Sequence, residues 1–135
     1  MAAIFLSWSP SLLTGIAEID AQHRTLVDQV NGVYSLMIGG ATTDRIAAEL
    51  ELLMQHTTAH FSFEEKRMRA AGYQQVEAHV REHHMLLGAA RNKLLAWADG
   101  EISAMELAKF VARWVTQHIR ECDMAYVPCL LAATG

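Results

Sequence analysis

Histidines and carboxylates set one helical turn apart are the residues of this chain most suited to chemistry. His60 precedes Glu64 by four residues, and His79 precedes His83 by the same interval. Side chains at positions i and i+4 of an α-helix share one face, so each pair offers two metal-binding groups to the same neighbour. Imidazole suits iron, zinc and copper as a ligand. The two pairs therefore indicate a metal site between helices.

Two further segments extend this pattern. His23 is a single histidine in the first apolar segment, and His118 precedes Asp123 by five residues. Five residues of a straight α-helix turn about 140° past the starting face, so His118 and Asp123 cannot share a face of a regular helix. We expect a local widening or a helix end between them, and a π-bulge is a common cause at functional sites.

The candidate ligands occupy positions that helices use for their core. Apolar residues recur along the chain in steps of three and four, which is the pattern of a helix face that is turned inward. Five of the seven histidines, together with Glu64, fall on these positions. The other members of the four inward stripes are Ile19, Leu26, Val30, Val33, Met37, Ile46, Leu50, Leu53, Thr57, Met68, Val76, Leu86, Ala90, Leu94, Trp97, Leu107, Val111 and Trp114.

A shared metal explains so many buried polar residues better than separate hydrogen bonds do. A buried polar group without a partner costs roughly 2–7 kcal/mol, whereas the net stability of a domain is only about 5–15 kcal/mol. Each residue alone has an ordinary interpretation, as part of a surface pair, as a hydrogen-bonded core histidine or as a solvated carboxylate. Hydrogen bonds between histidines could satisfy one or two of them, but a metal site would satisfy all of them together.

The elements that must position these residues are predicted to form an all-α, up-down-up-down antiparallel four-helix bundle. The 135 residues suit a single domain, and short breaks at 38–44, 70–74 and 98–103 make successive helices antiparallel neighbours. Ser103 and Glu106 have the spacing of a capping box and mark the start of the fourth helix. The expected elements are an irregular arm over about 1–17, helices over about 18–38, 43–70, 74–98 and 103–122, and a C-terminal tail.

Composition excludes several classes of protein. Apolar residues make up 52% of the chain, too many for a disordered protein. The formal net charge of -4 gives no electrostatic reason to bind nucleic acid. The N-terminus MAAIFLSWSP resembles neither a signal peptide nor a membrane span, so we expect a cytoplasmic protein. Cys122 and Cys129 form no CxxC motif and are expected to be reduced thiols, and we expect a monomer.

The order and spacing of these residues resemble the hemerythrin family, in particular its single-domain bacterial members. Trp8 and the pair Gly15-Ile16 are similar to the N-terminal arm of that family, and the resemblance covers nearly the whole chain. The segments that carry it are IDAQHRTLVDQVN (19–31), HFSFEEKRM (60–68), HVREH (79–83) and HIRECDMAY (118–126).

The resemblance implies a non-heme centre of two iron ions with an oxo or hydroxo bridge. The implied ligands are His79, His83 and His118 for one iron, His23 and His60 for the other, and Glu64 and Asp123 as bridges. One position on the two-histidine iron then stays open for a small ligand. The implied wall of an apolar oxygen pocket at this position consists of Phe61, Trp114, Val115 and Ile119.

The resemblance also implies reversible dioxygen binding, in a carrier, a store or a protein that delivers oxygen to an oxygen-consuming enzyme. An oxygen or redox sensor module is the alternative, although the short loops and the absence of an appended signalling domain count against it. An enzyme is a third interpretation, either a di-iron oxidase or peroxidase or a dinuclear hydrolase. Oxygen-activating di-iron bundles use Glu-x-x-His motifs, and no glutamate here precedes a histidine by three residues. We therefore expect a binding protein and not an enzyme.

Three polar residues near the predicted site remain. His84 is rotated about 100° from His83 and should face solvent. His56, one turn before His60, is expected to be partly exposed or hydrogen-bonded. Tyr126 is expected either to hydrogen-bond near Asp123 or to cap the site as an aromatic.

Overall fold

The computed structural model describes residues 6–134 of the chain, apart from the side chains at positions 121, 122 and 134. Helices dominate this part of the chain, and no strand occurs in it. The elements are a 3-10 turn η1 (Pro10–Leu12), the helices α1 (Ala17–Ile38), α2 (Thr43–Ala70), α3 (Val76–Ala98) and α4 (Ala104–His118), a π-helical turn η2 (Ile119–Asp123) and the helix α5 (Met124–Thr134).

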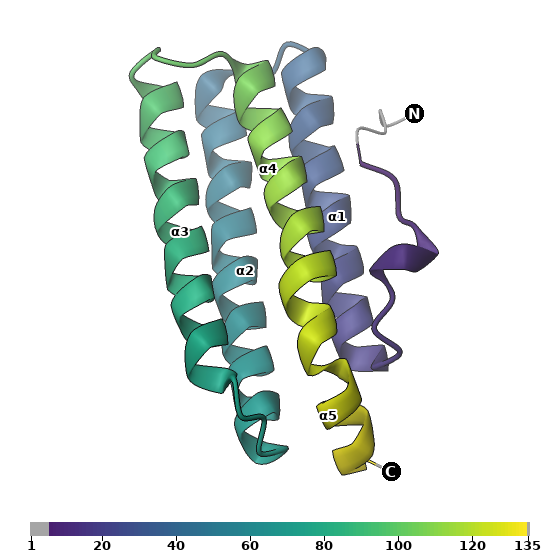
Figure 1. Cartoon of the computed structure of the whole chain (residues 1–135). Coiled ribbons are helices and arrows are strands. Elements are labelled where there is room, and N and C mark those ends of the chain that lie inside the picture. The colour runs from purple at the N-terminus through teal and green to yellow at the C-terminus, as the bar shows by residue number, and fades with distance from the viewer. Residues whose placement is uncertain (1–5, 135) are drawn as a thin grey trace.

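The four long helices run alternately up and down (Figure 1). α1 packs against α2 and α4, and α3 closes the ring by packing against the same two helices. α5 continues the direction of α4 beyond η2 and ends near the turn between α2 and α3 (Figure 1). The predicted all-α four-helix bundle is thus confirmed.

Short turns enforce the antiparallel order, and the connection from α3 to α4 shows how. Gly100 has a φ of 77°, a conformation that glycine adopts without steric cost. The following Glu101 N–H donates to the Ala96 carbonyl at 2.8 Å, which closes the end of α3. Two residues after Glu101, the Ser103 hydroxyl accepts a hydrogen bond from the Glu106 N–H at 3.1 Å and caps α4. The chain therefore reverses within a few residues, and the start predicted from the capping box is confirmed.

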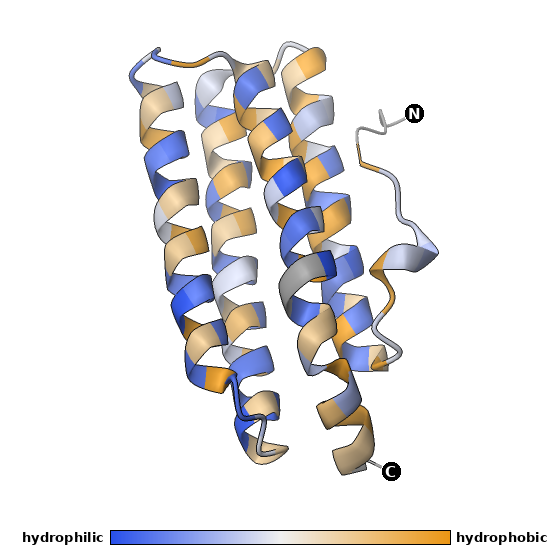
Figure 2. Cartoon of the chain, in the orientation of Figure 1, coloured by the Kyte–Doolittle hydropathy of each residue, from blue (hydrophilic) through white to orange (hydrophobic). Residues whose placement is uncertain are grey.

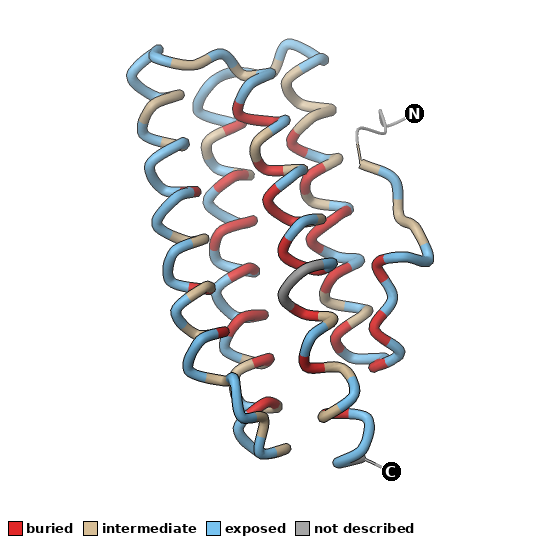
Figure 3. Tube along the Cα trace, in the orientation of Figure 1, coloured by how far each residue is buried: buried red, intermediate tan, exposed pale blue. Residues whose placement is uncertain are grey.

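The core lies between the helices and is shared unequally among them. Hydrophobic and hydrophilic residues alternate along the four long helices (Figure 2), and the buried positions of α1, α2 and α4 face the bundle interior (Figure 3). α3 is the exception, because among its residues only His79, His83 and Ala90 are buried. Leu86 and Leu94, which the stripe of this helix places inward, are half-buried. α3 therefore leaves room for solvent at its contact with α4.

From residue 6 to the start of α1, the N-terminal arm holds only the short turn η1, and it is tied to the start of α1. The Asp20 carboxylate accepts hydrogen bonds from the Thr14 N–H at 2.8 Å, the Thr14 hydroxyl at 2.7 Å and the Gly15 N–H at 3.1 Å. Trp8 packs against the main core, with the guanidinium of Arg24 5.3 Å from its ring centre. Asp20 thereby holds the arm against the end of the bundle that carries the candidate site.

The predicted C-terminal tail is wrong, because the chain is helical through α5. Pro128 lies near the start of this helix, where its missing N–H leaves a single intrahelical bond unmade. Tyr126 and Leu130 are buried and pack against Ile19 and Met68 in a second apolar cluster. This packing stabilises a helix whose proline would otherwise indicate a break. None of the helices in residues 6–134 combines the length and the apolar character that a bilayer span requires.

Candidate metal centre

The structure brings the seven predicted ligands together in the bundle interior, and none of them is more than 6% exposed. Their ligand atoms form two groups, and within each group all of these atoms lie within 4.8 Å of one another. The two groups share both carboxylates. One group consists of Glu64, His79, His83, His118 and Asp123, and the other of His23, His60, Glu64 and Asp123.

Asp123 faces both groups, with one oxygen toward each. Its Oδ1 lies 3.1 Å from His79 Nε2 and 2.9 Å from His118 Nε2. Its Oδ2 lies 2.9 Å from His23 Nε2. A carboxylate whose two oxygens point to different sets of imidazoles has the orientation needed to bridge two cations.

Glu64 also reaches both groups, and it has a partner outside them. Its Oε1 lies 3.0 Å from His60 Nε2 and 3.5 Å from His83 Nε2. The Tyr126 hydroxyl donates a hydrogen bond of 2.5 Å to Oε2. Burial and the charges of Asp123 and Glu64 raise the pKa of Tyr126 above its ordinary value, so its hydroxyl keeps the proton. Tyr126 was expected either to hydrogen-bond near Asp123 or to cap the site as an aromatic, and its hydroxyl bonds Glu64, the other carboxylate that both groups share.

The π-helical turn is what allows His118 and Asp123 to meet. α4 ends at His118, and residues Ile119–Asp123 then form the wider turn that the five-residue spacing predicts. The extra residue in this turn brings Asp123 back to the inner side of the helix. Of the two expected alternatives, a local widening or a helix end, the structure has the local widening, in the form of a π-helical turn.

Both carboxylates are held in their charged form although they are fully buried. Burial and the neighbouring Asp123 would raise the pKa of Glu64, but close contacts with His60 and His83 keep this pKa below its usual value. Burial would likewise raise the pKa of Asp123, and the imidazoles of His118, His23 and His79 keep it well below its usual value. The site is therefore built around two anions that imidazoles, or cations in their place, must compensate.

The donor set fits metal ions better than it fits hydrogen bonds alone. Among the described residues, the Nε2 atoms of His23, His60 and His83 have no aligned hydrogen-bond partner, although carboxylate oxygens lie close to them. Buried polar atoms are normally paired. Here Nε2 atoms and carboxylate oxygens face one another across a few ångströms. Cations placed between them would accept the lone pairs of both.

Two of the imidazoles have a hydrogen-bond partner at Nδ1, the ring nitrogen that faces away from the centre. Both partners lie outside the predicted ligand set. His83 Nδ1 lies 2.7 Å from Glu65 Oε2, and His60 Nδ1 lies 2.5 Å from Gln22 Oε1. Phe61 adds a stacking contact on His83, with ring centres 3.8 Å apart. Glu65 adjoins Glu64 and Gln22 adjoins His23 in the sequence. This adjacency to a predicted ligand is the one sequence feature that could have indicated their role.

A small enclosed cavity lies beside the two-histidine group. It leaves about 10 Å³ for the centre of a water-sized molecule, which is room for one small ligand. The four residues predicted to wall an oxygen pocket all line it, together with Thr57 and Leu26, which were predicted only as core residues. The full lining is His23, Leu26, Thr57, His60, Phe61, Trp114, Val115, His118 and Ile119.

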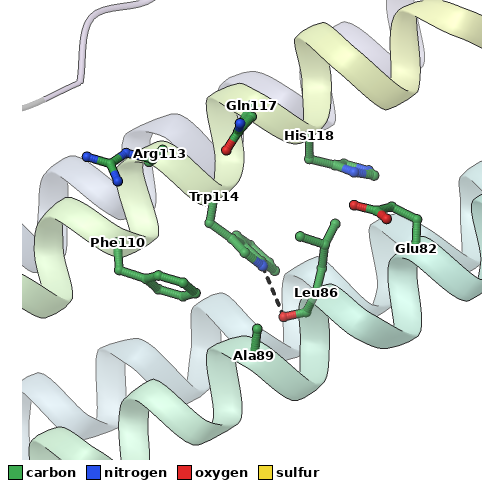
Figure 4. A pocket seen from close by; sticks show the side chains of 8 residues that line it. All are labelled: Glu82, Leu86, Ala89, Phe110, Arg113, Trp114, Gln117 and His118. Atoms are coloured by element: carbon green, nitrogen blue, oxygen red, sulfur yellow. Dashed lines mark hydrogen bonds between the residues drawn. The ribbon is translucent and has the colours of Figure 1, made fainter.

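A second, solvent-open groove of about 320 Å³ runs between α3 and α4 (Figure 4). Trp114 and His118 line both the groove and the enclosed cavity. The Trp114 indole N–H donates to the Leu86 carbonyl at 3.0 Å, which fixes the ring between the two spaces (Figure 4). Trp114 is thus a wall between solvent and the interior of the site.

The remaining candidates lie outside the centre. His84 is exposed, as predicted, and His56 is exposed and hydrogen-bonded to Gln29. Cys129 is a partly buried free thiol whose Sγ lies 3.5 Å from the Ala71 carbonyl. The side chain of Cys122 lies outside the described residues.

Comparison with known proteins agrees with this geometry. The Pseudomonas aeruginosa (strain PAO1) bacteriohemerythrin is 35% identical over 122 residues, which cover 90% of this chain and 79% of that protein. The Methylococcus capsulatus (strain Bath) bacteriohemerythrin is 32% identical over 120 residues, covering 88% of this chain and 91% of that protein.

Solved structures give the same result. A wild-type hemerythrin crystal structure superposes with a TM-score of 0.80 at 29% identity, covering 93% of this chain and 98% of that one. The crystal structure of a hemerythrin mutant gives a TM-score of 0.81 at 28% identity, covering 95% of this chain and 98% of that one. The model of the Hemerythrin HHE cation binding domain matches residues 14–130. With seven potential ligands buried in two overlapping groups, and with matches over nearly its whole length, this chain belongs to the hemerythrin family.

Proposed function

We propose that the chain binds dioxygen reversibly at a non-heme di-iron centre. The observation that supports this most is the overlap of the two ligand groups, which share Glu64 and Asp123. In this proposal His79, His83 and His118 would hold one iron, His23 and His60 would hold the other, and Glu64 and Asp123 would be shared between them. Iron would supply the electrons that dioxygen takes up on binding and returns on release.

The protein would orient the metal ligands, supply the negative charge of two carboxylates and keep water out of the cavity. Tyr126 fixes Glu64 through its hydroxyl, and the π-helical turn fixes Asp123. The two carboxylate charges would offset half of the four positive charges of two divalent cations in a medium that screens poorly. Five neutral imidazoles complete a set that favours binding over oxidation, because it adds no further anion to stabilise highly oxidised iron.

The cavity beside the two-histidine group supports binding rather than catalysis. Besides imidazoles, its polar groups within the described chain are the Thr57 hydroxyl and the Trp114 indole N–H. Both are already donated to backbone carbonyls, that of Leu53 at 2.7 Å and that of Leu86 at 3.0 Å. The cavity therefore offers a bound molecule no spare acid from its lining, and a proton source is what oxygen-activating chemistry requires.

Anaerobic loading with ferrous iron tests the proposal. A charge-transfer band in the visible spectrum should appear on exposure to air and fade under argon over repeated cycles. Prompt irreversible oxidation with release of peroxide would instead identify an oxidase. A band that responds to oxygen only when a second protein is present would favour the sensor role over that of a carrier or store.

A further inference from the structure

In each ligand group, one imidazole has a hydrogen-bond partner at its Nδ1 atom. The two groups differ in the chemical type of this partner. In the three-histidine group, His83 Nδ1 lies 2.7 Å from the Glu65 carboxylate. In the two-histidine group, His60 Nδ1 lies 2.5 Å from the Gln22 amide oxygen. Both partners are oxygen acceptors, so each Nδ1 donates the proton and each Nε2 keeps its lone pair toward the centre.

The two acceptors perform the same geometric task with different charge. Glu65 carries a full negative charge, and Gln22 is a neutral amide of nearly the same shape. A hydrogen bond to a carboxylate is stronger than one to an amide and makes the imidazole a better electron donor. The Glu65 side chain is 25% exposed and that of His83 only 1%, so solvent screens this charge only partly.

We infer that Glu65 and Gln22 are positioning residues that make the two metal positions unequal, with Glu65 strengthening the three-histidine position. The charge behind His83 should make that position bind a divalent cation first and hold the oxidised state of iron more tightly. The neutral amide behind His60 leaves the other position weaker and easier to reduce. The inference rests on the proposed function only in taking the two groups as halves of one centre.

The number of histidines also favours the three-histidine group, so the experiment must isolate the charge. The chain offers a reciprocal pair of substitutions that preserve shape: Glu65→Gln removes the charge behind His83 and keeps an acceptor, and Gln22→Glu adds a charge behind His60. Glu51→Gln is the matched control. It removes the same charge from an exposed carboxylate of α2 that pairs with Arg91, away from the centre.

Zinc serves as the probe because it is redox-silent and imidazole binds it well. Calorimetric titration of the metal-free protein should resolve a tight and a weaker step. Glu65→Gln should weaken the tight step by about 10- to 100-fold, the effect typical of a residue behind a metal ligand, and leave the weaker step unchanged. Gln22→Glu should strengthen the weaker step, and Glu51→Gln should match the wild type. Circular dichroism of each metal-free variant verifies that it is folded.

Three results would overturn the inference. In the first, Glu65→Gln matches the wild type and only Glu65→Ala loses affinity, so that the hydrogen bond matters and the charge does not. In the second, Glu65→Gln weakens both steps equally. In the third, Glu51→Gln weakens the tight zinc step as much as Glu65→Gln does, so that the effect follows from the net charge of the protein and not from Glu65.

The reduction potential of bound iron is a second measurement. It would not change if Glu65 and Gln22 only kept the imidazoles in place. The reduction potential of the iron-loaded protein should rise in Glu65→Gln and fall in Gln22→Glu. If iron-loaded wild type fails to bind oxygen reversibly while the zinc steps shift as expected, the proposed function fails and the inequality of the two positions stands.

Discussion

The Tyr126 hydroxyl donates a hydrogen bond of 2.5 Å to Glu64 Oε2, and both residues are completely buried. Tyr126 belongs to α5 and Glu64 to α2. The bond therefore ties the segment beyond the π-helical turn to one of the two shared carboxylates. The C-terminal helix thus contributes to the centre without itself supplying a ligand.

Tyr126→Phe should weaken the metal-free fold and the metal site together. The substitution keeps the ring and removes one partner of a buried carboxylate, which typically costs about 1–3 kcal/mol. Urea unfolding of the metal-free protein measures this loss, and the iron retained after dialysis against a chelator measures the site. Tyr34→Phe, in α1, is the control for iron retention: it removes a tyrosine hydroxyl that is not part of the site and should leave the retained iron unchanged. Iron retention equal to that of wild type would show that Glu64 keeps its orientation without the hydroxyl.

Asp123→Asn should prevent the chain from holding two irons. The amide has nearly the same shape as the carboxylate, but it cannot offer one anionic oxygen to each ligand group. Iron analysis of the purified protein should give at most one ion per chain in place of two. His84→Ala is the matched control, because His84 adjoins a ligand in sequence and faces solvent. Loss of iron in that control would show that α3 is rotated from its described position.

The metal-free protein should lose stability in acid through Glu64 and Asp123. The pKa of each group in the folded chain lies below its ordinary value of 4.5 for Glu64 and 3.8 for Asp123. A group with a lowered folded pKa stabilises the fold above its unfolded pKa, and this stability disappears as the pH falls through the folded pKa. The free energy of unfolding should therefore hold above about pH 5 and decline below it.

Urea titrations between pH 3 and pH 6, followed by circular dichroism, measure this dependence. Asp123→Asn should show a shallower decline, because one of the two groups no longer titrates. An unfolding free energy that stays constant from pH 6 to pH 3 would contradict the prediction.

Trp114→Ala should connect the solvent-open groove between α3 and α4 with the enclosed cavity. Truncation of a buried tryptophan typically costs about 3–5 kcal/mol, and water would gain a path to the site. We expect faster irreversible oxidation of the iron-loaded protein, followed by visible absorption after exposure to air. Phe110→Ala enlarges the groove on its outer side and should leave the oxidation rate near that of wild type. Equal rates in the two variants would mean that Trp114 is not the wall.

The burial of the candidate ligands could be predicted, because helix periodicity places most of them on apolar stripes. His60 and Glu64 sit on an apolar stripe, and any rotation of α2 that buries Leu53 and Met68 buries them as well. The His118–Asp123 spacing predicts an irregularity, either a local widening or a helix end, because no regular helix brings both residues to one face. Periodicity thus determines which face of a helix is buried.

The residues behind the imidazoles could not be predicted in this way. Whether His83 Nδ1 meets Glu65 depends on ring rotation and on the distance between α2 and α3, and side-chain periodicity contains neither quantity. The half-burial of Leu86 has a related cause, because the groove arises from the spacing of two helices. Helix α5 was not predicted, because the packing of Tyr126 and Leu130 that stabilises it is long-range.

The five-residue turn from Ile119 to Asp123 also limits how this centre could be transplanted. Four straight helices carrying the same seven side chains would direct the last carboxylate toward solvent. An engineer who grafts the centre into another bundle must therefore import an irregular backbone as well as a residue list. Straightening that turn while keeping its extra residue would direct Asp123 away from the other ligands and leave the helices intact.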